Sequence, residues 1–274
     1  MKSLQSHPLR ALINDSSLPS AIRELVQLSA IPMIPVERSA AVLERDPVGR
    51  RELFRLTNSV TMAPRADVRD VKLAIPMIGE RKVRPLLWSS LYRQIEEELE
   101  DLAVDAEAWL EHLPATVSMA TRLHDRLFPK GLIEETELEM AVWLSDIGKL
   151  VLLFHADLDY ERVLGRARVT EQPLCQIEAE LLGLTHAEVG AELLASEGHS
   201  PRLIACLRHR YTPHESPIQH LPYVAMLHLA DVLTWRQSGG DGFGGIAPPF
   251  EPRLFERLGI QGESLDRLLM KLTR

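Results

Sequence analysis

The sequence has few aromatic residues, few cysteines and no long apolar run, and each shortage excludes a class of protein. With 4 Trp, 4 Tyr and 6 Phe in 274 residues, the core is expected to be aliphatic. Cys175 and Cys206 have no CxxC spacing, which excludes a disulfide scaffold and indicates reduced core thiols in a cytoplasmic protein. No stretch is apolar for long enough to form a signal peptide or a membrane-spanning helix of roughly 20 residues, so we expect no membrane association.

Positive charge is also scarce. The chain has 31 basic and 39 acidic residues, a net charge of −8. Binding to nucleic acid without sequence preference needs a basic face, so we do not expect nucleic acid as a partner. The Arg-rich pieces Glu44–Arg55 and Glu80–Arg84 keep that alternative open. The most acidic stretch, EEELEDLAVDAE (96–107), is typical of a solvated connector or, alternatively, of a docking surface for a basic partner. We predict a boundary there between an N-terminal lobe, 1–100, and a second lobe, 101–274.

Helical periodicity covers almost the whole chain. Apolar residues recur at spacings of three and four, and no strand-like alternation is present, which predicts an all-α fold. The Gly-rich stretch SGGDGFGG (238–245) follows a helix and precedes a Pro-Pro pair, so we predict a flexible loop and not a phosphate cradle. The predicted helices are Pro19–Ser29, Pro35–Arg45, Val48–Ser59, Val68–Ile78, Lys82–Leu99, Ala106–Phe128, Glu134–Phe154, Leu158–Val169, Pro173–Leu182, His186–Ser196, Pro201–Tyr211, Pro222–Arg236, Pro252–Leu258 and Ser264–Lys271.

Polar residues inside apolar helices indicate where chemistry could occur. In AVWLSDIGKLVLLF (141–154), Ser145, Asp146 and Lys149 interrupt an otherwise apolar segment. A buried carboxylate there needs a metal, a cation or several hydrogen-bond donors. His228 and Asp231 lie three residues apart on one face of a second apolar helix.

Three further histidines lie on other predicted helices. His186 opens one helix, His209 closes another beside Arg210, and His112 lies near the start of the long helix 106–128. Any one of these histidines alone would be typical of a buried core residue whose hydrogen bonds are satisfied. Together with the two aspartates, they predict a convergent polar cluster.

In chain order these residues resemble the HD superfamily of metal-dependent phosphohydrolases, and more closely its HDOD group, the HD-related output domains of bacterial signalling proteins. The resemblance covers roughly residues 30–272 and implies a multi-helical HD-like bundle preceded by an N-terminal helical lobe. Besides the SDIGK pentapeptide, it is carried by ERDPVGRRELFRLTNSV (44–60), VKLAIPMIGERKVRPLLW (71–88), EAELLGLTHAEVGAELLASEGHSPRLIACLRHRYTP (178–213) and LFERLGIQGESLDRLLMKL (254–272).

The resemblance also assigns site residues, with two departures. It implies a vestigial metal-ligand set and a wider ligand pocket. Ser145 stands where the family has the His of its HD pair, and Arg210 stands where it has the second His of an HH pair. The implied metal set is His112, Asp146, His186, His209 and Asp231, and the implied pocket is Ser145, Asp146, His186, His209, Arg210, His228 and Asp231.

These departures weaken the implied metal chemistry. Ser145 is a poor neutral ligand, and Arg210 adds a fixed positive charge that would repel a second cation. Arg210 could instead pair with Asp146 or Asp231 and neutralise them without metal. We therefore expect no cofactor, with a bound divalent metal as the alternative.

Two functions follow from the resemblance. The first is a non-catalytic bacterial regulatory protein of signal transduction, which senses a small ligand in a degenerate HD pocket or acts through contacts with other signalling proteins. The alternative is a metal-dependent phosphohydrolase acting on a nucleotide or cyclic dinucleotide, with Asp146 and Lys149 as catalytic residues.

Overall fold

The structure is a computed structural model. It describes residues 18–59, 68–99, 102, 104–127, 133–155, 159–251, 253–260, 267, 268 and 270. Every regular element in these ranges is a helix, so the predicted all-α class is confirmed. Most of the predicted helix Ser264–Lys271 lies outside the described residues. No helix in the described ranges has both the length and the apolar character needed to cross a bilayer.

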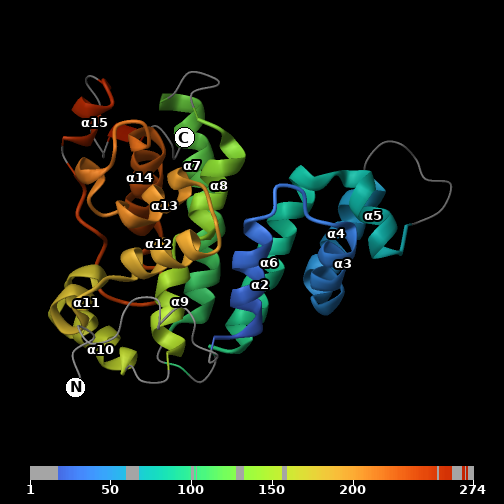
Figure 1. The fold of residues 1–274 in the computed structure, drawn as a ribbon, viewed down its shortest axis with the longest axis horizontal. Coiled ribbons are helices and arrows are strands. Elements are labelled where there is room, and N and C mark those ends of the chain that lie inside the picture. Colours follow the sequence, from blue (N-terminus) through green and yellow to red (C-terminus); the bar gives the residue numbers. More distant parts are fainter. Residues whose placement is uncertain are drawn as a thin grey trace. The chain divides into compact units, whose positions relative to one another are not determined.

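The chain divides into two compact units. The N-terminal unit, Pro19–Glu100, is coloured from blue to teal in Figure 1. The C-terminal unit consists of Asp101–Arg274, coloured from green to red, together with the segment that ends at Leu18. The N-terminal unit contains α2 (Ser20–Ser29), α3 (Val36–Arg45), α4 (Pro47–Ser59), α5 (Val71–Ile78) and α6 (Glu80–Glu97). The C-terminal unit contains α7 (Ala106–Leu127), α8 (Glu135–Trp143), α9 (Ile147–Phe154), α10 (Tyr160–Thr170), α11 (Leu174–Leu182), α12 (His186–Ser196), α13 (Pro201–Arg208), a 3-10 turn η2 (Pro213–Glu215), α14 (Leu221–Ser238) and α15 (Leu254–Arg257).

A single buried carboxylate organises the start of α4 in the N-terminal unit. Asp46 accepts hydrogen bonds from the backbone N–H groups of Val48, at 3.0 Å, and Gly49, at 2.9 Å, which caps the helix. Its carboxylate also pairs with Arg93 of α6. The local capping residue of α4 therefore also ties that helix to α6.

The C-terminal unit is built around α14, which packs mainly against α7. Nearly every residue of α14 from Tyr223 to Trp235 is buried, so the helix is covered on all sides and has no solvated stripe. Polar side chains on such a helix cannot reach bulk water. Its His228 and Asp231 must therefore find partners inside the unit.

The prediction of one continuous helix over Glu134–Phe154 is wrong. Helix α8 ends at Trp143, α9 begins at Ile147, and residues 144–146 form a turn. Within this turn the carbonyl oxygen of Ser145 accepts a hydrogen bond from Arg210 Nη1 at 2.5 Å. The residue that binds the backbone at this break is distant in the chain, since Arg210 lies 64 residues beyond Asp146.

A close backbone contact fixes α9 against α12. A Cβ atom added to Gly148 would lie 1.9 Å from the carbonyl oxygen of His186 and 2.8 Å from the backbone nitrogen of Gly190. Only glycine at residue 148 allows this approach without moving backbone. The glycine of the IGK sequence thus sets the position of the residues on either side of it.

Candidate functional site

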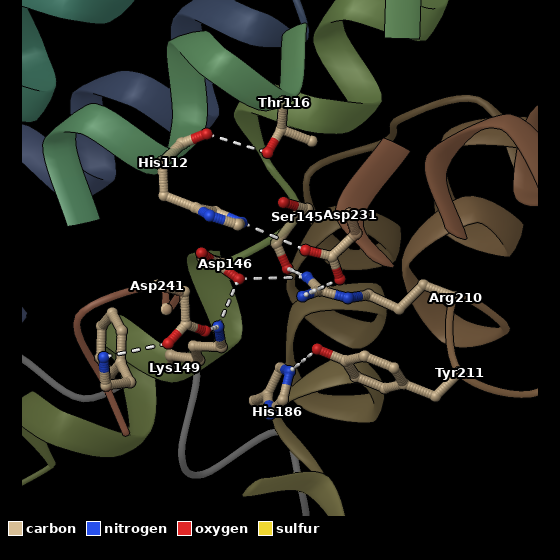
Figure 2. Close-up of polar contacts among 12 residues, drawn as sticks. His112, Thr116, Ser145, Asp146, Lys149, His186, Arg210, Tyr211, Asp231 and Asp241 are labelled. Carbon is tan, nitrogen blue, oxygen red and sulfur yellow. Dashed lines mark hydrogen bonds and ion pairs between the residues drawn. The ribbon is translucent and has the colours of Figure 1, made fainter. Parts of the chain in front are cut away.

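Six ionisable side chains from distant parts of the C-terminal unit meet in one place, shown in Figure 2. They come from α7, the α8–α9 turn, α9, the loop after α13, α14 and the loop after α14. Each is buried. We call them the buried charge cluster, which consists of His112, Asp146, Lys149, Arg210, Asp231 and Asp241.

Arg210 lies between two carboxylates. Its Nη1 is 3.1 Å from Asp146 Oδ1, and its Nη2 is 3.2 Å from Asp231 Oδ2. Figure 2 shows the guanidinium group spanning the two aspartates. Helix α13 ends at Arg208, not at Tyr211 as predicted, so Arg210 leaves the helix and its side chain can point inward.

Lys149 connects Asp146 to a third carboxylate. Its Nζ is 2.8 Å from Asp146 Oδ1, one helical turn earlier, and it also donates to Asp241. The ammonium group lies over the ring of Phe243, 5.0 Å from its centroid. A fully buried lysine is rare. Here two carboxylates and the face of an aromatic ring surround its charge.

Asp241 was missed by the sequence analysis because it lies in the glycine-rich stretch 238–245. That stretch is a loop, as predicted, but Asp241 and Phe243 are buried in it. Gly242 has a φ of +83°, and its carbonyl accepts a hydrogen bond from the Asp105 backbone at 2.9 Å. The loop is therefore a structural part of the site and not an exposed flexible connection.

His112 completes the cluster on the side of Asp231. Its Nε2 is 3.2 Å from Asp231 Oδ1, while its Nδ1 has no hydrogen-bond partner among the described residues. Burial alone would lower the pKa of His112, but the hydrogen bond and charge of Asp231 and the charges of Asp241 and Asp146 outweigh burial and raise it. Three carboxylates face only two permanent cations, Lys149 and Arg210, and this imbalance favours the protonated form of His112.

The internal cations keep the aspartates ionised. Burial raises the pKa of Asp146, but Lys149 and Arg210 outweigh it and hold that pKa far below the ordinary value. Burial is also the largest influence on Asp231, yet Arg210 and His112 lower its pKa to about 2. The charges of Asp146 and Asp241 raise the pKa of Lys149, against the effects of burial and of the nearby Arg210 charge. At neutral pH these groups therefore form permanent ion pairs.

A second buried network surrounds His186. Its Nδ1 and its backbone nitrogen lie 2.6 and 2.9 Å from Glu178 Oε2, and its Nε2 lies 2.9 Å from the hydroxyl of Tyr211. Tyr160 donates to the other oxygen of Glu178. The implied metal ligand His186 is therefore engaged with Glu178 and Tyr211. The sequence analysis missed Glu178, Tyr160 and Tyr211, which have no distinguishing pattern.

The remaining predicted site residues have different positions. His228 donates from Nδ1 to the carbonyl oxygen of Arg210 at 2.7 Å and accepts from the Glu251 backbone at 3.3 Å, which supports the loop that carries Arg210. His209 caps the end of α13, half-buried, and no hydrogen bond or ion pair joins it to the cluster within the described ranges. Ser145 contributes its backbone carbonyl, as noted above for Arg210.

A sequence model of the HDOD domain matches residues 16–213. The chain belongs to the HDOD family. No similar sequence was found among curated proteins.

Solved structures share this fold at low sequence identity. An HDOD domain protein of unknown function from Geobacter sulfurreducens is 18% identical with a TM-score of 0.63, covering 93% of this chain and 87% of its own. A proposed signal transduction protein from Marinobacter aquaeolei VT8 is 20% identical with a TM-score of 0.62, covering 98% of this chain, which spans only 59% of that protein. A proposed phosphohydrolase from Shewanella amazonensis SB2B is 21% identical with a TM-score of 0.61, covering 99% and 95%. These likenesses show the fold alone.

The metal ion implied by the HD superfamily can be tested against this HDOD site. Arg210 occupies one oxygen of Asp146 and one of Asp231, and His112 occupies the other oxygen of Asp231. A divalent cation between these carboxylates would lie beside the charges of both Arg210 and Lys149. Within the described part of the chain, no three His, Cys, Asp or Glu side chains form a group that could hold a metal. As arranged, these residues do not fit a divalent cation.

A small recess opens beside the buried charge cluster. It has room for about one water molecule. Pockets that bind small ligands are typically about 300–1,000 Å³, so a nucleotide does not fit the recess in this conformation. The recess is lined by Lys149, Pro173, Leu174, Cys175, Tyr211, Trp235, Asp241, Gly244, Ile246 and Pro248.

Proposed function

We propose that this HDOD chain is a non-catalytic regulatory protein of bacterial signal transduction, which acts through contacts with other signalling proteins. The observation that carries the proposal is the guanidinium group of Arg210, which pairs with both Asp146 and Asp231. These are the two carboxylates on which the superfamily's metal chemistry would depend. An internal ion-pair network can stabilise one conformation of a fold, and this role requires no catalytic activity.

Sensing of a small ligand in the degenerate HD pocket receives less support than protein contacts. The recess beside Lys149 and Tyr211 has room for about one water molecule. A nucleotide or cyclic dinucleotide would require the side chains of the buried charge cluster to separate. Isothermal titration with cyclic dinucleotides tests this branch, and saturable binding that is lost in Tyr211→Ala would favour it.

A metal-dependent phosphohydrolase remains the second candidate, because one observation favours it. His112, Asp146 and Asp231 meet in one cluster, in the chain order that the HD resemblance implies. If Arg210 moved aside, these three residues would be the candidate ligands of a divalent ion. Lys149, which pairs with Asp146, would hold that carboxylate in place.

Metal analysis and hydrolysis assays decide between the two candidates. The protein is purified without chelator and assayed with manganese, magnesium and zinc against nucleotide and phosphodiester substrates. We expect no stoichiometric metal and no turnover that depends on Asp146. Stoichiometric metal, with turnover that disappears in Asp146→Ala but persists in the control Asp125→Ala on the exposed end of α7, would overturn the regulatory proposal.

We also propose a cytoplasmic location, supported by the chemistry of the two cysteines. Both are unpaired thiols. Burial raises the pKa of Cys175 to about 11 and raises that of Cys206 further, so both stay protonated and unreactive. Fractionation of cells that express a tagged chain tests the location, and recovery of the chain outside the cytoplasmic fraction would contradict it.

A further inference from the structure

Helix α5 of the N-terminal unit carries large apolar side chains on its exposed face as well as on its buried face. Its inner face is buried and packs against α3 and α4, while its outer face exposes Leu73 and Met77, which are 65% and 50% accessible and lie one turn apart. An amphipathic surface helix normally carries polar residues there. We call the exposed residues Lys72, Leu73, Pro76 and Met77 the α5 outer face.

The stretch of sequence that contains α5 is basic, in contrast to the rest of the chain. Residues 47–84 contain nine basic and four acidic residues, whereas the whole chain has 31 basic and 39 acidic. The described acidic side chains of this stretch are all engaged: Glu52 pairs with Arg55, Asp70 caps α5, and Glu80 pairs with Arg84. None of these acidic side chains pairs with Arg50, Arg51, Lys72 or Lys82.

Four of these cations are exposed on α5 or on the two helices, α4 and α6, that pack against it. Lys72 lies on α5 itself, Lys82 lies in the first turn of α6, and Arg50 and Arg51 lie on α4, which packs against α5. In the part of the chain that the structure describes, none of the four has a side-chain hydrogen bond or ion pair. An exposed leucine and methionine next to Lys72, with further unpaired cations on the two helices packed against α5, form a surface complementary to an acidic, amphipathic segment.

We propose that the α5 outer face docks an acidic amphipathic helix of a partner protein, with Leu73 and Met77 as the apolar anchors. This inference rests on the proposed regulatory role and names the chemistry of the partner. A second copy of the chain is disfavoured, because two such faces would bring like charges together. Nucleic acid is disfavoured, because phosphate contacts need cations and leave Leu73 and Met77 without a role.

The test measures fluorescence anisotropy with the full chain and three labelled probes. The probes are a designed helical peptide with leucines on one face and flanking glutamates, the same peptide with lysines in place of the glutamates, and a DNA duplex. We expect the acidic peptide to bind in preference to the other two, more weakly as salt is raised. The double variant Leu73→Ser/Met77→Ser should lower its affinity about tenfold or more.

Matched controls separate docking from folding. Val169 on α10 is 83% accessible in the other unit, so Val169→Ser should leave the affinity unchanged. Lys72→Glu/Lys82→Glu should weaken the acidic peptide and strengthen the basic one. All these positions are exposed, so circular dichroism and the melting temperature should match the parent protein.

Several results would overturn the inference. These are no binding of the acidic peptide, equal binding of both peptides, tighter binding of the duplex, or self-association of the chain that Leu73→Ser/Met77→Ser abolishes. The regulatory proposal fails by different measurements, because metal content and hydrolysis depend on residues of the C-terminal unit. A chain that binds both metal and the acidic peptide would refute the non-catalytic regulatory proposal and support the docking proposal.

Discussion

The two units of this chain contain buried charge in different ways. In the N-terminal unit, Asp46 pairs with Arg93, whose side chain keeps 29% of its surface accessible, and Asp46 also caps a helix. In the C-terminal unit, Asp146, Lys149 and Arg210 each keep only 2% of their side-chain surface accessible. A half-solvated pair tolerates the loss of a partner, whereas a fully buried network does not.

The largest expected effect comes from removing the central cation of the buried charge cluster. Arg210→Met should lower the free energy of unfolding by about 3–5 kcal/mol, because Asp146 and Asp231 would remain buried without their shared partner. In the N-terminal unit Arg93→Met should lower it by only about 1–3 kcal/mol, since Asp46 keeps its backbone donors. Urea denaturation followed by circular dichroism measures both. Equal losses for the two variants would remove the distinction between the units.

The space around particular glycines also differs between the two units. Gly148→Ala should destabilise the protein by about 3 kcal/mol, because the new methyl group meets the rigid backbone of His186. Gly49→Ala in the N-terminal unit should lose only about 1 kcal/mol, since the nearest atoms there are the side chains of Ser90 and Asp46. Gly165→Ala on α10 meets nothing within 4 Å and should gain about 0.5–1 kcal/mol. Thermal melts rank the three variants, and any other order would contradict the contacts described.

Acid should destabilise the chain through the aspartates that its cations hold ionised. The pKa of Asp231 is about 2 in the folded protein, below its unfolded value of 3.8. Its contribution is therefore complete above pH 4 and disappears as pH falls toward 2, a loss of about 2 kcal/mol. Urea denaturation between pH 6 and pH 2.5 should show a smaller loss in Asp231→Asn than in the parent chain. An identical pH dependence in both would mean that Asp231 is not held ionised.

The smallest expected effects concern single hydrogen bonds. Tyr160→Phe removes one donor from buried Glu178 and should cost about 1–2 kcal/mol. Arg55→Ala in the N-terminal unit breaks an exposed pair with Glu52 and should leave stability unchanged. Differential scanning calorimetry resolves both. A larger loss for Arg55→Ala than for Tyr160→Phe would show that burial does not set the strength of these contacts.

The sequence predicted the parts of this molecule that depend on local pattern. Aliphatic spacing predicted the helices, and a proline stands at the start of many of them, as Pro201 does in α13. The polar positions of Asp146 and Asp231 in apolar helices also indicated buried partners, and Arg210 was one candidate. Sequence patterns therefore predict a structural feature when its physical cause lies in residues that are neighbours in the chain.

The rest depends on contacts between distant residues. The break between α8 and α9 lies where Arg210 donates to the Ser145 carbonyl, in a stretch whose residues are otherwise typical of one helix. Asp241 belongs to the cluster because Gly242 docks on the Asp105 backbone, which no periodicity reveals. In the sequence, Glu178 has the position of an ordinary polar helix residue. Its importance is visible only from its contacts with His186 and Tyr160.

The central claim is that Arg210, and not a metal ion, joins Asp146 and Asp231. A crystal structure of the full chain, grown with manganese and measured at a wavelength where manganese scatters anomalously, tests this claim directly. We predict a guanidinium group in contact with both carboxylates and no anomalous peak between them. A manganese peak bound by Asp146 and Asp231, with the Arg210 side chain displaced from them, would contradict the account.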